Sequence, residues 1–350
     1  MTDRPDPGAD LARYSRQILF EGLGEEGQRR ICASSVAVVG AGALGSFHAS
    51  ILARAGVGVL RLIDRDFVEA SNLQRQVLYD EEDARQLLPK ATAAERKLRR
   101  VNSQVKVEGI VADLNFTNAD RLLSGVDLIL DGSDNFEARL LINDFAVARG
   151  VPWVYGACVG SYGLAFAILP GDTPCLRCIF ESAPPPGTTP TCDTAGVLGS
   201  IVAVISGVQT AEALKILSGR RERVNRHIVA ADVWEGRLQA IELGPGARRA
   251  DCPVCGRHQF EYLEGRAGSD SATLCGRNAV QFRPHNASAI DLAEVEKRLA
   301  PLGRVARNPF LVRASVESYE ITVFADGRAI IGGTQDPGVA RSVYARYVGG

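Results

Sequence analysis

The sequence has no marked excess of charge of either sign and no long uninterrupted apolar run. Its 40 Lys and Arg residues nearly balance 41 Asp and Glu residues, so bulk electrostatics give no reason to expect nucleic acid or an anionic membrane as a partner. The longest apolar stretch, residues 197–208, contains serines and glycines and is too short to span a bilayer. Residues 1–10 are polar, are expected to be disordered and lack the apolar stretch of a signal peptide. These absences predict a cytoplasmic globular protein with no nucleic-acid or membrane partner.

Histidine is also scarce, and the four histidines are scattered, so each is expected to be a surface or packing residue. Cysteine is more frequent: four of the eight cysteines form two C-x-x-C pairs, Cys175/Cys178 and Cys252/Cys255. In a cytosolic chain such pairs favour a metal over disulfides, and four thiolates suit tetrahedral zinc. The 74-residue separation from Cys178 to Cys252 is long for a compact zinc finger, and a redox C-x-x-C is the alternative.

A glycine-rich turn follows an apolar strand near the start of the chain. Residues 36–45 read as strand and G-x-G-x-x-G, then comes a helical pattern, and a second apolar strand ends in Asp64, 19 residues after Gly45. This context is typical of a dinucleotide-type fingerprint. Gly40, Gly42 and Gly45 let the backbone approach a phosphate at the helix start, while Asp64 suits ribose hydroxyls. The alternative is a turn that only packs strand against helix.

Alternating strand and helix patterns up to residue 149 predict an α/β fold with a Rossmann-like, doubly wound, mainly parallel sheet. Residues 152–157 and 162–169 read as two more strands, which predict an antiparallel extension of that sheet. After the second cysteine pair the composition changes, and short strands and helices predict a small α+β appendage. We therefore expect a disordered N-terminus, an α/β domain with a zinc site, and a C-terminal domain of unknown role, over residues 1–10, 11–256 and 257–350.

Several polar residues fall near the expected carboxyl ends of the parallel strands, where open α/β sheets bind ligands. Asn72, Arg75 and Lys90 supply donors and more positive charge than a dinucleotide's pyrophosphate needs. Asp134 offers the hard oxygen ligand that Mg²⁺ prefers. Together these residues indicate ATP with magnesium rather than NAD. The alternative is that the cations are solvated surface charges and that Asp134 only caps the following helix.

In combination these motifs resemble the ThiF/MoeB/HesA family of ubiquitin-activating-enzyme-like adenylyltransferases. The resemblance covers residues 11–256 in order, with small departures at Ala43, where relatives commonly carry glycine, and at Ser133, where threonine is usual. The matching segments are residues 13–18, 40–45, 64–66, 71–76, 89–90, 131–135 and 192–196, together with both C-x-x-C pairs. In that family the C-terminal glycine carboxylate of a small ubiquitin-like sulfur carrier attacks the α-phosphate of ATP. Pyrophosphate leaves, and sulfur later converts the acyl-adenylate to a thiocarboxylate.

The resemblance implies a role for each matching residue. Arg16 is expected to reach the phosphates of the neighbouring subunit in a homodimer. The three glycines form the nucleotide turn, Asp64 holds the ribose, and the phosphates and magnesium are held by Asn72, Arg75, Lys90 and Asp134. The four paired cysteines are expected to share one structural zinc ion. Cys192 aligns with a cysteine that some relatives use for a covalent bond to the carrier or to sulfur, and it is otherwise an unreactive loop thiol.

The predicted function is ATP-dependent adenylylation of a sulfur-carrier protein that ends in Gly-Gly. The sulfur donor is expected to be a sulfurtransferase or a cysteine desulfurase. Thiamine, molybdopterin, cysteine and thiolated-tRNA pathways all remain open at this point. Two alternatives belong to other classes: a non-catalytic adaptor that binds nucleotide or carrier, and an NAD-dependent oxidoreductase.

Overall fold

The computed structural model describes residues 11–183, 192–244, 246–267, 271–274, 278–282 and 290–348, with backbone only at 192–193 and 271–274. The chain divides into two compact units. The first unit comprises Met1–Pro184 and Val197–Ala267, and the second comprises Pro185–Gly196 and Gly268–Gly350. Residues 1–10, which the sequence predicts to be disordered, lie outside the described residues.

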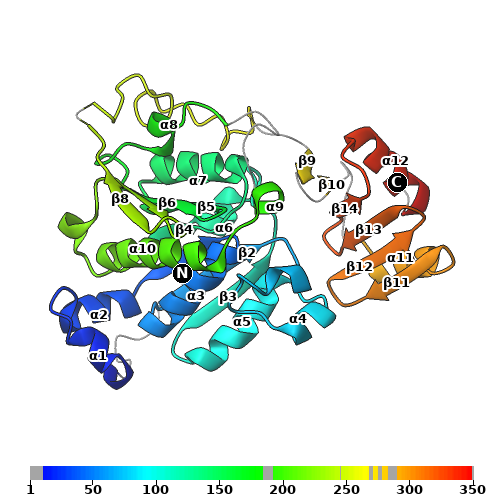
Figure 1. Cartoon of the computed structure of the whole chain (residues 1–350), viewed down its shortest axis with the longest axis horizontal. Helices are drawn as coiled ribbons and strands as arrows, with labels where there is room; N and C mark the ends of the chain where they lie inside the picture. Colours follow the sequence, from blue (N-terminus) through cyan, green and yellow to red (C-terminus); the bar gives the residue numbers. More distant parts are fainter. Residues whose placement is uncertain are drawn as a thin grey trace. The chain divides into compact units, whose positions relative to one another are not determined.

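The first unit is built on an eight-stranded sheet in the order β3-β2-β1-β4-β5-β6-β7-β8 (Figure 1). Pairing is parallel from β3 to β5 and antiparallel from β5 to β8. This arrangement confirms the mainly parallel sheet with an antiparallel extension. The strands are β1 (Ser35–Val39), β2 (Val59–Asp64), β3 (Lys106–Val111), β4 (Leu128–Asp131), β5 (Trp153–Val159), β6 (Tyr162–Ile168), β7 (Ile228–Asp232) and β8 (Arg237–Ile241).

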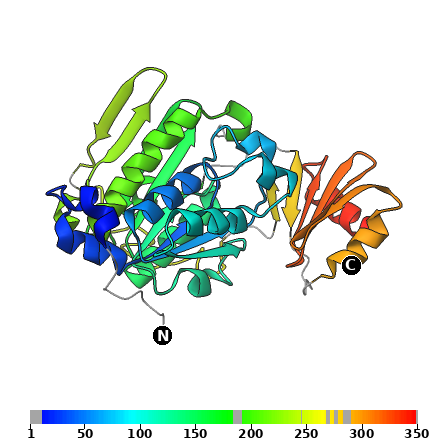
Figure 2. The same cartoon turned by 90° about the horizontal axis from the view of Figure 1, so that it is seen from below.

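Helices cover both faces of this sheet (Figures 1 and 2). On one face lie α3 (Ala43–Ala55), α5 (Lys90–Val101) and α10 (Gly199–Leu217). On the other lie α6 (Ala119–Leu123), α7 (Phe136–Arg149) and α8 (Leu176–Ile179). Shorter elements of the first unit are η1 (Leu11–Tyr14), α1 (Ser15–Ile18), α2 (Gly24–Cys32), η2 (Ala70–Asn72), α4 (Glu81–Arg85) and η3 (Arg221–Arg223).

The helix α10 passes through the core of the first unit. It is the one helix of the described residues that is long and apolar enough to cross a membrane, by length and composition only. The prediction that its apolar run is too short for this is therefore wrong. In the fold, 56% of the most apolar 18-residue segment of this helix is buried. The buried polar side chain of Gln209 on this helix donates to the carbonyls of Asp131 and Val154 in two strands. These contacts are those of a core helix in a globular fold.

The order of the strands reverses between β1 and β4. From β1 the chain continues to β2 on one side of the sheet, whereas β4 pairs with β1 on the other side. The connections that follow these two strands therefore separate at the carboxyl edge, where open α/β sheets bind their ligands. Most of the predicted site residues follow these strands or their neighbour β2.

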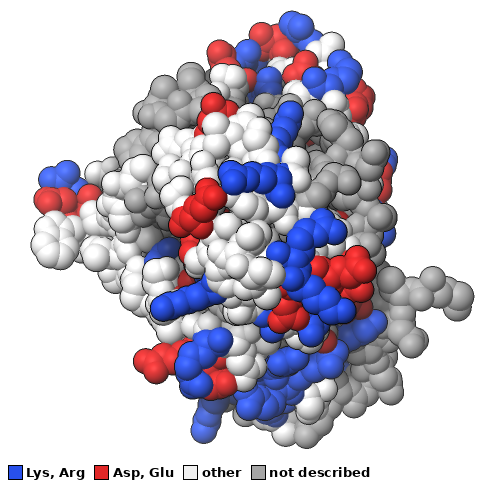
Figure 3. Space-filling view, turned by 90° about the vertical axis from the view of Figure 1, so that its right-hand side faces the viewer, with Lys and Arg blue, Asp and Glu red and all other residues white. Residues whose placement is uncertain are grey.

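In its described residues the second unit has a six-stranded antiparallel sheet that packs with the helices α11 and α12, which agrees with the predicted α+β appendage. Its strand order is β11-β12-β13-β14-β10-β9. It has a core of its own, drawn from these strands and helices. Figure 3 draws one face of the molecule, on which acidic and basic side chains are mixed and basic ones gather toward the lower end of the view. The elements are α9 (Cys192–Ala195), β9 (Ser271–Leu274), β10 (Ala279–Phe282), α11 (Leu292–Leu299), β11 (Gly303–Arg307), β12 (Leu311–Val316), β13 (Tyr319–Phe324), β14 (Ala329–Gly332) and α12 (Pro337–Tyr347).

Candidate nucleotide and metal sites

The glycine turn between β1 and α3 packs directly on the backbone of the β4–α7 connection. Gly40 has a φ of +86°, and a Cβ added there would lie 2.5 Å from the carbonyl oxygen of Gly132. A Cβ on Gly45 would lie 1.8 Å from the oxygen of Gly40, and one on Gly132 would lie 2.7 Å from the same oxygen. Only glycine fits these positions. Two backbone segments at the strand-order reversal are thereby held in contact, directly before the start of α3.

Asp64 ties this turn to the end of β2. Its side chain is 8% exposed. One carboxylate oxygen accepts a hydrogen bond from the backbone N–H of Ala41, and the other from that of Asp66, both at 2.6 Å. Burial raises the pKa of Asp64, and the nearby ammonium group of Lys90 opposes this rise. Each oxygen keeps a lone pair that a ribose hydroxyl could use.

Lys90 lies beside the same turn, at the first position of α5. Its side chain is 4% exposed, and its Nζ lies 3.3 Å from a carboxylate oxygen of Asp66. The buried hydroxyl of Tyr79 lies 2.6 Å from the oxygen of Ala41 and 3.2 Å from that of Lys90, so it links the turn to the start of α5. Lys90 is therefore a buried cation beside Asp66 and Asp64, and Asp64 is itself bonded to the glycine turn. A solvated surface charge, the alternative considered for it, is wrong.

The segment that carries Asn72 and Arg75 reaches the glycine turn through Gln76. A Cβ added to Gly42 would approach only Gln76, at 3.8 Å from its Nε2. The buried Oε1 of Gln76 has no hydrogen-bond partner within the described part of the chain. Asn72 is buried, and its Oδ1 accepts from the N–H of Glu69. Arg75 is partly exposed and donates to the carbonyl of Ser71.

Asp134 is exposed in the connection between β4 and α7. The alternative role considered for it, capping the following helix, is wrong, because the side chain of Asn135 caps α7 by accepting from the N–H of Ala138 at 2.7 Å. For the Asp134 carboxylate the described residues supply no hydrogen bond or ion pair. A hard oxygen ligand without an internal partner fits a divalent cation.

Arg65, at the end of β2, lies among several carboxylates of this edge. Burial lowers its pKa, but Asp113 and Asp66, and then Asp134 and Asp64, raise it more. Its guanidinium group is 3.0 Å from a carboxylate oxygen of Asp113. Asp134 is therefore near the same edge of the sheet as Asp64, as the sequence predicts.

Arg16 is not brought to the nucleotide turn of its own chain. It is exposed on α1, and its neighbour Gln17 donates to the carbonyl of Ala55 at the C-terminal end of α3. The glycine turn lies at the N-terminal end of α3, and a 13-residue helix spans about 20 Å. Cys192 begins α9, and its side chain lies outside the described residues.

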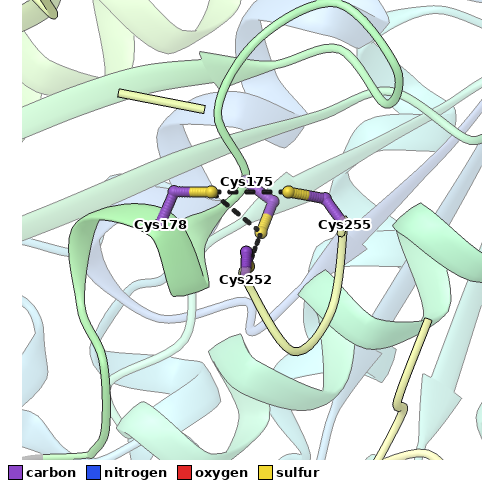
Figure 4. A group of neighbouring side chains, drawn as sticks. All are labelled: Cys175, Cys178, Cys252 and Cys255. Atoms are coloured by element: carbon purple, nitrogen blue, oxygen red, sulfur yellow. Dashed lines mark hydrogen bonds between the residues drawn. The ribbon is translucent and has the colours of Figure 1, made fainter. Parts of the chain in front are cut away.

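The four paired cysteines converge on one point (Figure 4). All four sulfur atoms lie within 4.8 Å of one another. The Sγ–Sγ distances are 3.9 Å for Cys175 and Cys178, 3.6 Å for Cys175 and Cys252, and 3.4 Å for Cys178 and Cys255. A tetrahedral site with Zn–S bonds of about 2.3 Å has sulfur atoms about 3.8 Å apart, so the cluster fits zinc. Because all four positions are taken by thiolates, such a site would be structural.

Tyr79 lies at the glycine turn but was not singled out from the sequence. Its role depends on a tertiary contact, since it bonds to Ala41, 38 residues earlier. Asp66 and Gln76 stand in the segments that match the family, but the sequence assigned neither of them a role.

A model described as the ThiF family matches residues 14–254. The chain belongs to the ThiF family. It is 42% identical to the sulfur carrier protein ThiS adenylyltransferase of Bacillus subtilis over 338 residues, which are 96% of this chain and 99% of that protein. It is 40% identical to the SAMP-activating enzyme E1 of Haloferax volcanii over 254 residues, 73% of this chain and 92% of that protein. The crystal structure of E. coli MccB with ATP superposes with a TM-score of 0.61 at 23% identity, over 71% of this chain and 75% of that one, which shows a shared fold.

Proposed function

We propose that this protein is an ATP-dependent adenylyltransferase that activates the C-terminal glycine of a small ubiquitin-like sulfur-carrier protein. The observation that carries the proposal is the 42% identity to a sulfur carrier adenylyltransferase over 99% of that protein's length. The buried Lys90 near the glycine turn supports this proposal, because a fixed cation stabilises the negative charge that develops on a phosphate during the reaction.

In this proposal the residues at the carboxyl edge of the sheet orient ATP and balance its charge. The glycine turn and the start of α3 present backbone N–H groups to phosphate, and Asp64 binds the ribose. Lys90, Arg75 and Asn72 stabilise the negative charge that builds on pyrophosphate as it leaves. Asp134 would hold magnesium, which neutralises phosphate charge when bound. No general base is needed, because the attacking carboxylate is already ionised.

We propose that the carrier is of the ThiS type. The matched region of the Bacillus ThiS adenylyltransferase takes in 96% of this chain and so includes most of the second unit. The Haloferax SAMP-activating enzyme aligns over only 254 residues. The second unit is therefore a feature shared with the ThiS-directed relative. Sulfur for the thiocarboxylate would come from a sulfurtransferase or a cysteine desulfurase.

We propose a homodimer in which Arg16 of one protomer completes the phosphate site of the other. The location of Arg16 near the far end of α3 supports this arrangement, because it is remote from the turn in its own chain. Cys192 is proposed to bond covalently to the carrier or to sulfur after adenylylation. Intact-mass spectrometry after turnover should find an adduct that the Cys192→Ser variant lacks, and an unmodified chain under turnover would contradict this role.

The test of the function is ATP–pyrophosphate exchange with purified carriers that end in Gly-Gly. Exchange should require the carrier, and deletion of its final glycine should abolish it. Absence of exchange with every such carrier of the source organism would contradict the proposal. Nucleotide binding without exchange would indicate an adaptor, and NAD reduction would indicate an oxidoreductase.

A further inference from the structure

The connection between β4 and α7 carries Asp134, and a largely buried arginine of α7, Arg139, bonds to this connection. Arg139 lies in the first turns of α7, and helical side chains lean toward the N-terminal end of their helix. Its side chain is 11% exposed and reaches back to Asp131, which is completely buried at the end of β4. The guanidinium group of Arg139 and the carboxylate of Asp131 thus lie next to the connection.

Arg139 bonds to three separate residues of the first unit. Its Nε lies 3.0 Å from a carboxylate oxygen of Asp131, at the end of β4. Its Nη2 donates to the carbonyl of Ser133 at 2.9 Å and to that of Gly156, in β5, at 3.2 Å. The other oxygen of Asp131 accepts from the backbone N–H and the hydroxyl of Ser133. One guanidinium group therefore fixes the end of β4, the connection and β5 relative to each other.

The same arginine is packed against an aromatic ring. Its guanidinium carbon lies 5.2 Å from the centre of the Tyr155 ring, within cation–π range. Burial lowers the pKa of Arg139, but Asp131 raises it more, and Asp134 contributes in the same direction. The Asp134 carboxylate is thus within electrostatic reach of this arginine. A buried ion pair is weak evidence for stability alone, because desolvation offsets most of its attraction.

The residue that Arg139 holds, Ser133, directly precedes Asp134. We propose that Arg139 is the positioning residue that fixes the Asp134 carboxylate at the nucleotide site. The inference rests on the proposed function, since it takes Asp134 as the ligand of the magnesium ion that accompanies ATP. Gly132, one residue before Ser133, packs against the glycine turn. On the other side of Asp134, Asn135 is held by its hydrogen bond from the N–H of Ala138 at the start of α7, so Asp134 lies between two residues that hydrogen bonds hold in place.

The Arg139→Lys variant separates positioning from charge. Lysine keeps the positive charge beside Asp131 but cannot also reach the carbonyls of Ser133 and Gly156 in the planar geometry of a guanidinium. Binding of α,β-methylene ATP is measured by calorimetry over a series of Mg²⁺ concentrations and in EDTA. We expect the Mg²⁺ concentration for half-maximal binding to rise about tenfold, the scale typical of groups that orient metal ligands. Binding in EDTA should not change.

Arg149→Lys is the matched control, since Arg149 is the last residue of the same helix and is exposed. It should bind like the wild type. In an Asp134→Asn background, Arg139→Lys should cause no further loss, because it acts through Asp134. Wild-type Mg²⁺ dependence in a folded Arg139→Lys variant, or an equal loss in the Asp134→Asn background, would overturn the proposal. If thermal unfolding shows Arg139→Lys to be unfolded, Asp131→Asn is measured instead and should shift the same Mg²⁺ dependence.

Calorimetry requires no carrier and no turnover, so the two proposals can fail separately. Mg²⁺-dependent binding of the ATP analogue without any exchange would contradict the proposed function and leave the role of Arg139 intact. A wild-type chain that does not bind the analogue with Mg²⁺ would overturn both.

Discussion

At the scale of single residues, Lys90 shows how one buried charge can be tested. Its side chain is 4% exposed, and its ammonium group lies near the carboxylates of Asp66 and Asp64. Lys90→Met removes the cation without adding a polar group. Carrier-dependent ATP–pyrophosphate exchange should fall on the order of 10²–10³-fold, because a donor aimed at developing charge is lost. The exchange assay measures this directly.

Arg100→Ala is the control for that variant, since Arg100 is an exposed cation on the same helix. It should retain wild-type exchange. Equal losses in the two variants would assign the effect to the helix rather than to the site.

The sequence predicts those site residues whose position follows from local order. Asp64 ends a strand and Lys90 follows a proline that starts a helix, so each lies at a strand or helix boundary. Tyr79 and Arg139 could not be predicted in the same way. Their functions depend on contacts with Ala41 and with Gly156, which only the folded sheet brings near.

At the scale of secondary-structure elements, the longer helices were predicted well and several short elements were missed. The patterns at residues 90–101 and 136–149 predict helices, and α5 and α7 have these bounds. The short helices α4 and α6 and the strands β9 and β11 were not predicted. Elements of four or five residues carry little periodicity and are easily missed. Their formation depends on neighbouring strands and on the core.

The helices α3 and α10 are joined by a buried hydrogen bond between His48 and Gln209, 2.8 Å long. Burial lowers the pKa of His48 to about 4, below its unfolded value of about 6.5. Between these two values the unfolded chain binds more protons, so stability falls as pH drops from 6.5 to 4, by about 3 kcal/mol in total. In urea unfolding, the free energy of unfolding of His48→Gln should lack the loss that His48 causes at low pH. The stability of this variant relative to the wild type should therefore improve toward pH 4. A constant difference across pH would contradict this.

The helix α7 is joined to the segment after the second cysteine pair by Asp144, which is 1% exposed. Its carboxylate accepts from the N–H groups of Tyr262 and Leu263 at 2.9 and 3.4 Å. Burial raises its pKa to about 7, against the opposing effect of these two bonds. The folded chain therefore binds more protons between pH 4 and 7, and Asp144 costs stability as pH rises through that window.

Asp144→Asn keeps an oxygen acceptor for Tyr262 and removes the charge. Its thermal midpoint should exceed that of the wild type above pH 7 and approach it near pH 4, the opposite trend to His48→Gln. Thermal unfolding followed by circular dichroism at both pH values measures this. A variant that is destabilised equally at both would show that the carboxylate is needed for its hydrogen bonds alone.

At the scale of the whole molecule, the cysteine cluster joins distant parts of the first unit. Cys252→Ser should reduce bound zinc, measured by elemental mass spectrometry, and should lower the thermal midpoint, because metal binding contributes to folding free energy. Cys32→Ser, in α2 and outside the cluster, should keep the metal. Wild-type zinc content in the Cys252→Ser variant would show that the four thiols do not form one site.

The spacing of this cluster also sets an order in time. Cys175 and Cys252 are separated by 77 residues, as are Cys178 and Cys255. During synthesis Cys175 and Cys178 leave the ribosome before Cys252 and Cys255, so at first only two of the four thiols are present. At that stage β6, α10, β7 and β8 are not yet joined by the complete cluster. The metal can be enclosed only after Cys255 emerges. Zinc binding at this cluster would therefore be a late step in the maturation of each newly made chain, and zinc-starved cells should then accumulate incompletely folded protein rather than inactive but intact enzyme.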